Sequence, residues 1–477
     1  MSSETELKID LSEEALERLV GSHLLGEAGR IIEQRSTYFD TPDRRLWREG
    51  CTLRIRKVGE ARMQTVKATG PARSLFARSE WETPVNRDEP VVDHTSPLAG
   101  EFGSELKLEP VFDVVVERRQ WDIEENGSRF EVVVDQGEVV AGDRRSPIRE
   151  VEVELKDGNP SDLFVFARRI DAVTGFRFGV RSKAERGFAL VEAQKLVFKS
   201  EPIHLDPDMN AAAAFQAIAV SCVRQFRLNE DVLLQKRNSE ALHQARVALR
   251  RLRSAFSLFR ELIPSDEALR LKEDLRWIAA ALGEARNVDV LLAKAEDADL
   301  VLKLKSARDV VYRDAIEALN SPRSRALMLG LIEWLWSREY SSGDIPGARD
   351  FAARALDKLR KRIKKGGQAL AKMDDEHRHE VRKDAKKFRY AAEFFASLFD
   401  DRRGARRHRK FLAAMELLQD DLGSLNDLAT GPDVLQKHGL SDHPAKDSVL
   451  SHADKEALIH RAQASVDEVL DTKRFWR

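Results

Sequence analysis

Cysteine is scarce in this chain of 477 residues, which contains only Cys51 and Cys222. The two lie in different halves of the sequence, so they offer neither metal-ligand spacing nor a disulfide framework. Long apolar runs are also missing, and a mean hydropathy of -0.45 with 34% charged residues leaves no stretch that resembles a membrane span. The first ten residues have neither a basic start nor an apolar run, so no secretory signal is visible. We therefore expect a cytoplasmic protein that makes no contact with a membrane.

An excess of one charge sign is missing too, because 80 basic and 81 acidic residues give a formal net charge of -1. Residues 1–200 carry a net charge of -6, so the remainder carries +5. How the charges are arranged on each face matters more than this modest asymmetry. Hydrophobic residues, at 42%, suffice for folded cores, and the length exceeds what one core usually organises. We expect two or three domains.

Two kinds of periodicity divide the chain. From residue 1 to about 195, apolar and polar residues mostly alternate, as in residues 53–56 and 150–155, which predicts β-strands. Helical patterns are few there, chiefly residues 12–20 and 161–174. Residues 196–210 have the composition of a linker, and from residue 211 to about 470 long patterns of period 3.6 predict an all-α region. The sequence thus predicts a two-domain α+β protein.

The predicted strands carry their charges on one face, because residues two apart on a strand point the same way. Glu4, Glu6 and Lys8 share a face of the first strand, and Glu150, Glu152 and Glu154 share a face of a later one. Further same-face pairs are Arg54/Arg56, Thr65/Lys67, Glu80/Glu82, Arg118/Gln120, Glu131/Asp135 and Arg181/Lys183. A solvent-exposed polar face explains any single strand. A closed barrel with its charges inside and its apolar face covered outside explains all of them.

Charges gathered inside a barrel need counter-ions, because buried like charges repel one another. Pairs of acidic residues then imply divalent cations, and pairs of basic residues imply an anion. Hard Mg²⁺ or Mn²⁺ ions that are bound by carboxylates and bridge to phosphate oxygens meet both needs.

These segments, in their order along the chain, resemble the CYTH family of triphosphate tunnel metalloenzymes. The family motif ExExK stands here at residues 4–8, and the resemblance covers nearly all of residues 1–195. The other matching segments are residues 38–42, 53–56, 65–67, 80–82, 118–121, 150–156 and 182–187. The motif alone is unspecific, but its occurrence together with these segments is specific. The resemblance implies an eight-stranded antiparallel β tunnel in residues 1–195.

Site residues follow from this resemblance, position by position. It implies that one or two Mg²⁺ or Mn²⁺ ions are held by Glu4, Glu6, Glu80, Glu82, Glu152 and Glu154. It implies that phosphate oxygens are bound by Lys8, Arg54, Arg56, Lys67, Arg118, Arg181 and Lys183. Catalytic roles are expected for Glu4, Glu6 and Lys8, with a glutamate orienting the attacking water. For Lys8, structural neutralisation of Glu4 and Glu6 is an equal alternative.

A repeated basic pattern lies in the helical region. In each copy a histidine is followed by basic residues at offsets of 3, 7, 8 and 10. The copies consist of His243, Arg246, Arg250, Arg251 and Arg253, and of His379, Arg382, Lys386, Lys387 and Arg389. This recurrence predicts two related helical bundles, at about residues 211–330 and 345–470.

On a helix, the histidine and the residues at offsets 3, 7 and 10 form one narrow stripe, while Arg251 stands off it. A solvated charged face is the ordinary explanation for one such helix. Recurrence at identical offsets favours a surface that binds a polyanion, since arginine and lysine bind phosphate most strongly in multiples. The histidines have three open roles: donating to phosphate, orienting an arginine, or packing between helices.

The repeated stripe resembles the CHAD family of conserved-histidine α-helical domains, which are often joined to CYTH domains, over about residues 211–470. The resemblance implies two related helical bundles around a basic surface or pore that binds inorganic polyphosphate. It assigns this binding to His243, Arg246, Arg250, Arg253, His379, Arg382, Lys386 and Arg389. Two positions depart from the family pattern, in segments that we expect to be loops. Asn287 stands where an aspartate is usual after Arg286, and Asn426 replaces an arginine.

The leading hypothesis is a metal-dependent inorganic triphosphatase that converts triphosphate to pyrophosphate and phosphate, joined to a helical domain that binds long-chain polyphosphate. One alternative is hydrolysis of an organic triphosphate, such as thiamine triphosphate or a nucleotide. Another is a non-catalytic module that targets polyphosphate granules. Basic helices also bind nucleic acid in many proteins, a partner that we do not expect here. We expect a cytoplasmic location, including polyphosphate granules.

Overall fold

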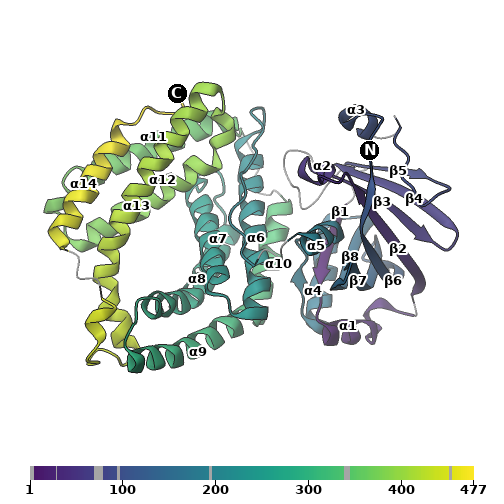
Figure 1. Ribbon diagram of the computed structural model, residues 1–477, viewed down its shortest axis with the longest axis horizontal. Coiled ribbons are helices and arrows are strands. Elements are labelled where there is room, and N and C mark those ends of the chain that lie inside the picture. The colour runs from purple at the N-terminus through teal and green to yellow at the C-terminus, as the bar shows by residue number, and fades with distance from the viewer. Residues whose placement is uncertain are drawn as a thin grey trace. The chain divides into compact units, whose positions relative to one another are not determined.

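The computed structural model describes residues 5–27, 29–68, 79–93, 97–192, 196–337, 344–450 and 454–477 (Figure 1). The chain divides into two compact units, Met1–Leu196 with Met328–Glu333 and Val197–Leu327 with Trp334–Arg477. The first unit is built on a β-sheet and the second is helical, which confirms the predicted α+β class. Our residue boundaries for the domains and the linker stay predictions. None of the described helices is long and apolar enough to cross a membrane.

One antiparallel sheet organises the first unit, with the strand order β5-β4-β3-β2-β6-β7-β8-β1-β9. The strands are β1 (Thr5–Asp10), β2 (Arg30–Asp40), β3 (Cys51–Val58), β4 (Ala61–Ala68), β5 (Ser79–Pro84), β6 (Glu109–Glu125), β7 (Ser128–Ala141), β8 (Arg144–Asp157) and β9 (Arg177–Phe178). The sequence predicts eight strands, and the described residues form nine. The additional strand is the two-residue β9, which pairs with the end of β1.

The register of the sheet places the charged residues on one side, which we call the polar face. Residues directly opposite each other on paired strands point to the same side of a sheet. Opposed residues on this face are Lys8 and Glu152, Glu6 and Glu154, Arg118 and Asp135, Lys67 and Glu80, and Thr65 and Glu82. The charged residues that the sequence placed on a common face therefore share one in these strands, although β6 also carries Glu117 and Arg119 on the opposite side.

Helices cover the apolar face. Phe166 of α4 (Pro160–Thr174) stacks on Phe130 of β7, with 5.5 Å between ring centroids. Helix α1 (Glu13–Val20), which the side chain of Ser12 caps, packs beside α4. Leu46 of α2 (Arg45–Arg48) and Leu98 of α3 (Pro97–Phe102) belong to one apolar cluster with residues of β3 and β4. Burial of these side chains stabilises the sheet from its apolar side, and a second buried cluster, which includes Phe112, Val114 and Phe188, lies at one end of the other side.

Helix α5 (Lys183–Val191) corrects one prediction. The sequence pattern places Arg181 and Lys183 on one face of a strand, and this is wrong, because Lys183 is the first residue of α5. Ser182 caps the helix by accepting a hydrogen bond from the Glu185 backbone N–H, and Glu185 accepts one from the Ser182 N–H in return. Phe188 packs edge-on against Phe112 of β6. Helix α5 thus covers one end of the polar face, and the charged residues occupy the other end.

The helical region consists, in its described part, of α6 (Ala211–Lys236), α7 (Ser239–Leu258), α8 (Asp266–Leu292), α9 (Ala298–Asn320), α10 (Pro322–Ser337), α11 (Ala348–Gly367), α12 (Asp375–Phe394), α13 (Arg402–Lys437) and α14 (Lys455–Asp471). The two basic stripes lie on α7 and α12, which are both 20 residues long and contact each other. Each begins four residues before its histidine, His243 or His379. These matched helices fit the predicted duplication (Figure 1).

The segments that contain Asn287 and Asn426, which follow the pairs Leu282-Gly283 and Leu422-Gly423, are not loops as predicted, because they lie inside α8 and α13. Gly283 of α8 has a packing role that does not require the helix to end. A Cβ at this position would lie 2.5 Å from a terminal guanidinium nitrogen of Arg246. The glycine therefore gives Arg246 room to reach the α8 backbone, where it donates to the carbonyl oxygen of Ala279 at 3.1 Å.

Candidate functional sites

A cluster of three carboxylates lies on the polar face. Oxygens of Asp135, Glu150 and Glu152 lie within 4.8 Å of one another, close enough to hold a metal ion. The sequence predicted Glu152 as a metal ligand and missed the other two. Alternation along the chain places Asp135 and Glu150 on polar faces, but it does not reveal the pairing of β7 with β8 that makes them neighbours.

Three cations surround this cluster. The ammonium of Lys183 contacts Glu150 and lies 2.7 Å from Asp135 and 3.4 Å from Glu152. Lys8 lies 2.7 Å from Glu152. Arg118 donates two hydrogen bonds to Asp135, at 2.8 and 2.7 Å. The cluster is therefore compensated by the protein itself.

The ionisation of this network follows from the balance of burial and charge. Burial raises the pKa of Glu152, but Lys183, Lys8 and Arg118 outweigh it and hold that pKa well below its usual range. The pKa values of Asp135 and Glu150 are lowered for the same reason. Burial lowers the pKa of Lys8 and Lys183, but the neighbouring carboxylates have the larger effect and raise the pKa of both lysines. The network is ionised at neutral pH, so its members are suited to holding charges in place rather than to exchanging protons.

Glu6 lies beside this network but, unlike its carboxylates, has no ion pair among the described residues. No ion pair reaches its carboxylate within 4.0 Å among the described residues, whereas its register neighbour Glu154 pairs with Lys156 at 2.7 Å. Burial and the nearby carboxylates of Glu152 and Glu154 raise the pKa of Glu6, against the opposing effect of Lys8. A divalent cation would relieve this crowding of negative charge. The donor set of carboxylate oxygens fits a hard ion. Glu4, the other glutamate of the motif, lies outside the described residues.

The remaining part of the polar face is basic. Lys67 pairs with Glu80 at 2.6 Å, and Arg54 lies 3.9 Å from Glu80 and donates to the hydroxyl of Tyr38 at 3.4 Å. Arg56 has no ion pair in the described part of the chain. The Nε atoms of Arg54 and Arg56 are buried without a hydrogen-bond acceptor. Buried donors without acceptors are costly, so oxygens of a bound anion would stabilise this end of the face.

Two further predicted residues lie at the margins of this arrangement. Glu82 accepts a hydrogen bond from Thr65 at 3.3 Å. Arg181 is partly buried and lies two residues before α5. Among the described residues, the polar face thus combines an acidic side chain that has no ion pair with two arginines whose buried Nε atoms lack acceptors, which is an arrangement suited to a metal ion together with a phosphorylated anion.

The two stripes of the helical region line one cavity of about 730 Å³, here called the basic cavity. The predicted residues that line it are Arg246, Arg250, Arg253, His379, Arg382 and Lys386. Lys387, which belongs to the second copy but was not assigned to binding, also lines it, and the sequence missed the basic lining residues Lys272, Arg276, Lys294 and Lys383. Neither His243 nor Arg389 is among the lining residues, and Arg389 pairs instead with Glu393 at 2.9 Å. The structure therefore brings six of the eight predicted stripe residues to a single cavity.

Positive charge exceeds negative charge in the described lining of the basic cavity, where Glu380 pairs with Lys383 at 2.7 Å and Asp427 is the other acidic residue. Burial and the neighbouring Arg250 and Arg382 lower the pKa of Lys386 to about 7. Burial, Arg250 and Arg286 lower the pKa of Arg246 to about 10. Burial and Arg250 also lower the pKa of Arg382. Such downward shifts on neighbouring cations mean that each one repels the others, so a polyanion would stabilise them all.

Asn426 of α13 holds part of this arrangement in place. Its side-chain oxygen accepts a hydrogen bond from Arg382 at 2.8 Å and lies 3.2 Å from Nδ1 of His379. The residue that departs from the family pattern thus contacts two stripe residues. Among the roles left open for the histidine, this contact favours His379 helping to orient Asn426 and Arg382.

The fold defines a class of protein, one with a β-domain that carries a charged face followed by a helical domain that carries a basic cavity. Family models agree with this description: a CYTH domain matches residues 2–188 and a CHAD domain matches residues 217–436. The chain belongs to the CHAD family and carries a CYTH domain in its N-terminal part.

Two relatives illustrate these matches. An inorganic triphosphatase from Haemophilus influenzae is 35% identical over 166 residues, which make up 34% of this chain and 47% of the relative. The chain therefore spans about half the length of this curated relative. The crystal structure of the CHAD domain from the plant Ricinus communis is 30% identical, with a TM-score of 0.50, and the match covers 57% of this chain and 96% of that chain.

Proposed function

We propose that the N-terminal domain is a metal-dependent inorganic triphosphatase that hydrolyses triphosphate to pyrophosphate and phosphate. The observation that carries this proposal is the placement on one face of Glu6, which has no ion pair among the described residues, and of Arg54 and Arg56, whose buried Nε atoms lack an acceptor. A relative named inorganic triphosphatase supports the choice of substrate. The compensated network beside them supplies rigidity, because each carboxylate is held by a cation.

The proposal assigns each group a role. Mg²⁺ or Mn²⁺ is bound by Glu4, Glu6, Glu152 and Glu154, with Glu80 and Glu82 as further ligands. When bound, the ion neutralises negative charge that develops on the phosphoryl oxygens. Phosphate oxygens are bound by Arg54, Arg56, Lys67 and Arg181. Lys8, Arg118 and Lys183 hold the carboxylates and add positive potential. Glu6 orients a water whose oxygen bonds to the terminal phosphorus and whose proton passes to solvent, while the bridging P–O bond breaks and pyrophosphate leaves with the bonding electron pair.

A substrate panel tests the enzymatic proposal. Triphosphate, ATP, thiamine triphosphate and long polyphosphate are compared by phosphate release with Mg²⁺ and with Mn²⁺. We expect triphosphate to be hydrolysed fastest, because the basic groups of the polar face bind phosphates. We expect EDTA to abolish the reaction until metal is restored, because the acidic groups bind the metal ion. Faster hydrolysis of an organic triphosphate would favour that alternative. Lack of turnover with all four would favour a non-catalytic binding module.

We infer that the helical domain binds long-chain polyphosphate in the basic cavity. None of the described residues that line it is Phe, Tyr or Trp. Proteins that bind single-stranded nucleic acid without sequence preference commonly stack bases on aromatic side chains, so this lining favours a chain of bare phosphates. Such binding places the protein at polyphosphate granules in the cytoplasm. Competition of labelled polyphosphate by DNA or RNA at matched phosphate and salt tests this inference, and it fails if nucleic acid displaces the label more readily than unlabelled polyphosphate does.

Polyphosphate affinity is expected to fall as the pH rises above about 7. In the free protein the pKa of Lys386 is about 7, and a bound phosphate chain raises it by favouring the ammonium form. Binding therefore takes up a proton above pH 7 and weakens by up to roughly tenfold per pH unit. Below pH 7 the lysine is already charged and contributes its full attraction. Fluorescence anisotropy with labelled polyphosphate at constant ionic strength measures this slope.

Two variants isolate Lys386 in this experiment. Lys386→Arg keeps the charge at every pH used, so it should bind at pH 9 nearly as well as at pH 7. Lys386→Met should bind more weakly than the wild type at pH 6.5 and show the same flattened dependence. A decline with pH that persists unchanged in both variants would assign the effect to another group.

A further inference from the structure

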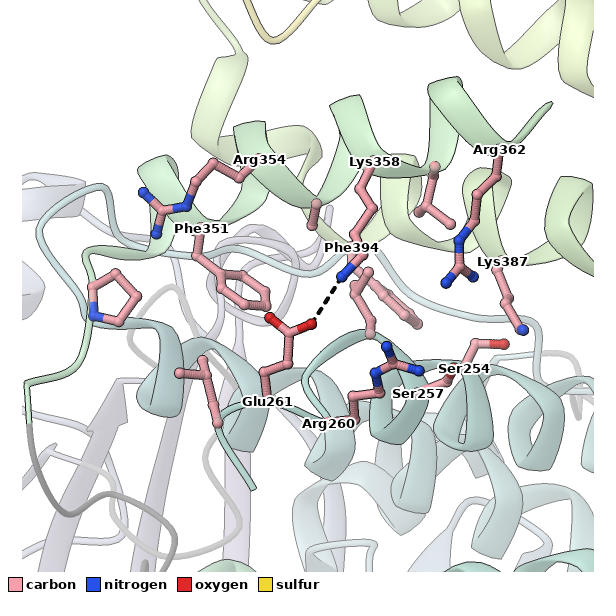
Figure 2. Close-up of a pocket in the computed structure, with 15 residues that line it drawn as sticks. Ser254, Ser257, Arg260, Glu261, Phe351, Arg354, Lys358, Arg362, Lys387 and Phe394 are labelled. Atoms are coloured by element: carbon pink, nitrogen blue, oxygen red, sulfur yellow. Dashed lines mark hydrogen bonds and ion pairs between the residues drawn. The ribbon is translucent and has the colours of Figure 1, made fainter. Parts of the chain in front are cut away.

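A second pocket, of about 260 Å³, lies in the helical region between the end of α7 and the helices α11 and α12 (Figure 2). Three of its lining residues, Ser254, Ser257 and Lys387, also line the basic cavity. The two spaces therefore share a wall. Their chemistry differs, because the smaller pocket combines charged side chains with aromatic and aliphatic ones, whereas the described lining of the basic cavity has no Phe, Tyr or Trp.

The apolar part of the small pocket centres on Phe351 of α11. One face of its ring stacks on Phe259, with 4.5 Å between centroids. The residue stays partly exposed, and Figure 2 shows its ring directed into the pocket. Leu262, Pro346 and Leu359 add aliphatic surface to the same space. A planar or apolar group of a ligand would lose its contact with water here.

The basic part lies at the other end, where Figure 2 shows Arg260, Arg362 and Lys387 converging around Ser257. Arg260 makes no hydrogen bond or ion pair within the described part of the chain. Arg362 and Lys387 share Asp384 at 3.6 and 3.7 Å, both longer than a hydrogen-bonded ion pair. Three cations thus face one loosely held carboxylate, which leaves an excess of about two positive charges.

A second acidic residue in the pocket does not reduce this excess. Glu261 is engaged by Lys358 at 2.8 Å, a pair that Figure 2 shows spanning the middle of the pocket. The pair separates the aromatic end from the basic end. Arg354 also lines the pocket, beside Phe351 in Figure 2, so one end combines an aromatic ring with a cation and the other gathers the three cations that suit an anion of about two charges.

We propose that this pocket binds a small phosphorylated molecule with a planar ring, of the nucleoside monophosphate class. The ring lies against Phe351, and the phosphate lies between Arg260, Arg362 and Lys387. A phosphate monoester carries close to two negative charges at pH 7, which matches the excess of positive charge. A bare phosphate chain gains nothing from the apolar walls, and an uncharged aromatic molecule leaves the cations unmatched. The volume suits one ring and one phosphate better than a long chain.

A ligand in this pocket weakens polyphosphate binding in the basic cavity, because both ligands bind the same ammonium group of Lys387. This consequence rests on the proposed polyphosphate site, whereas binding of the nucleotide does not. The small pocket thus gives the helical domain a means of responding to nucleotide concentration.

Isothermal titration calorimetry on the full chain tests the proposal with AMP, adenosine and inorganic phosphate. AMP should bind saturably, and adenosine and phosphate should each bind at least tenfold more weakly. Arg260→Gln combined with Arg362→Gln should weaken AMP binding at least tenfold, and Phe351→Leu should weaken AMP while leaving phosphate unchanged. The control is Arg402→Gln with Arg403→Gln, two exposed arginines at the start of α13 that remove the same charge elsewhere.

Three outcomes would overturn the proposal: AMP binding that the Arg260/Arg362 double variant retains, phosphate binding as tight as AMP binding, or no saturable AMP binding at millimolar concentration. Polyphosphate binding by the double variant, measured in parallel, shows whether the helices remain folded. If the wild type binds polyphosphate but not AMP, nucleotide binding in the small pocket is rejected and polyphosphate binding in the basic cavity is not. If the wild type does not bind polyphosphate, the proposed polyphosphate site in the basic cavity is rejected instead.

Discussion

Replacement of Glu6 by glutamine is expected to slow triphosphate hydrolysis by about 10²–10⁴-fold, the range measured when an acid–base group is removed. Glutamine keeps the shape of the side chain but cannot carry the negative charge that a metal ion and an attacking water require. The substitution should disturb the fold little, because Glu6 has no ion pair among the described residues that the change would break. Initial rates of phosphate release with saturating Mg²⁺ or Mn²⁺ measure the effect.

The matched control is Glu117→Gln. Glu117 lies on the opposite side of β6 from the polar face, where it is partly exposed and pairs with Arg119 at 2.8 Å. This variant should hydrolyse triphosphate at the wild-type rate, since an exposed ion pair contributes little to stability and nothing to the site. Equal rates for Glu6→Gln and the wild type would contradict the catalytic proposal. Polyphosphate binding should be unchanged in both variants, because the basic cavity lies wholly in the helical region.

The polar face could be predicted from the sequence because alternation along a strand has a fixed period of two. Glu6 and Lys8 must share a side whatever the neighbouring strands are, and so must Arg54 and Arg56. Which strands pair, and in which register, is decided by the packing of the whole sheet. The placement of Asp135 beside Glu150 therefore became visible only in the structure, although each residue had been placed on a polar face.

The error at Lys183 had a signal in the sequence. A serine followed three residues later by a glutamate is the pattern of a capping box, and Ser182 and Glu185 form one here. The short basic segment was interpreted as the continuation of an alternating pattern instead. The expected role of Lys183 changes with this correction. At the N-terminus of a helix that packs on the sheet, its ammonium lies among three carboxylates.

The basic stripes show which features of the basic cavity helical periodicity could predict. Spacing of three and four residues predicted correctly that stripe residues share a helical face. It did not distinguish residues that line a cavity from residues that bind a partner on the same helix. Arg389 pairs with Glu393, four residues later, and this acid was readable in the sequence. Lys272 and Arg276 of α8 also stand four apart, but only the packing of α8 against α7 turns them toward the cavity.

Replacement of Lys183 by methionine is expected to lower the free energy of unfolding of the N-terminal domain by about 3–5 kcal/mol. The side chain of Lys183 is 8% exposed and that of Glu150 is fully buried. Methionine fills a similar volume but removes the nearest cation of buried Glu150, which keeps only Lys8 at 3.7 Å as an ion-pair partner, and it takes one of the two cations from Asp135. For a domain of this size the midpoint of thermal unfolding should fall by roughly 10 °C, as differential scanning calorimetry would measure. The exposed Lys57 of β3, replaced in the same way, should leave the midpoint nearly unchanged.

The double variant Lys183→Met with Glu150→Gln separates loss of the ion pair from loss of packing. Removing both charges leaves no unpaired ion, since Arg118 still holds Asp135 through two hydrogen bonds. Its stability should therefore exceed the value obtained by adding the two single losses, by a coupling energy on the order of 1–3 kcal/mol. Strictly additive losses would show that Lys183 acts through packing alone. A single Lys183→Met variant as stable as the wild type would mean that water reaches the carboxylates and that the network does not organise the polar face.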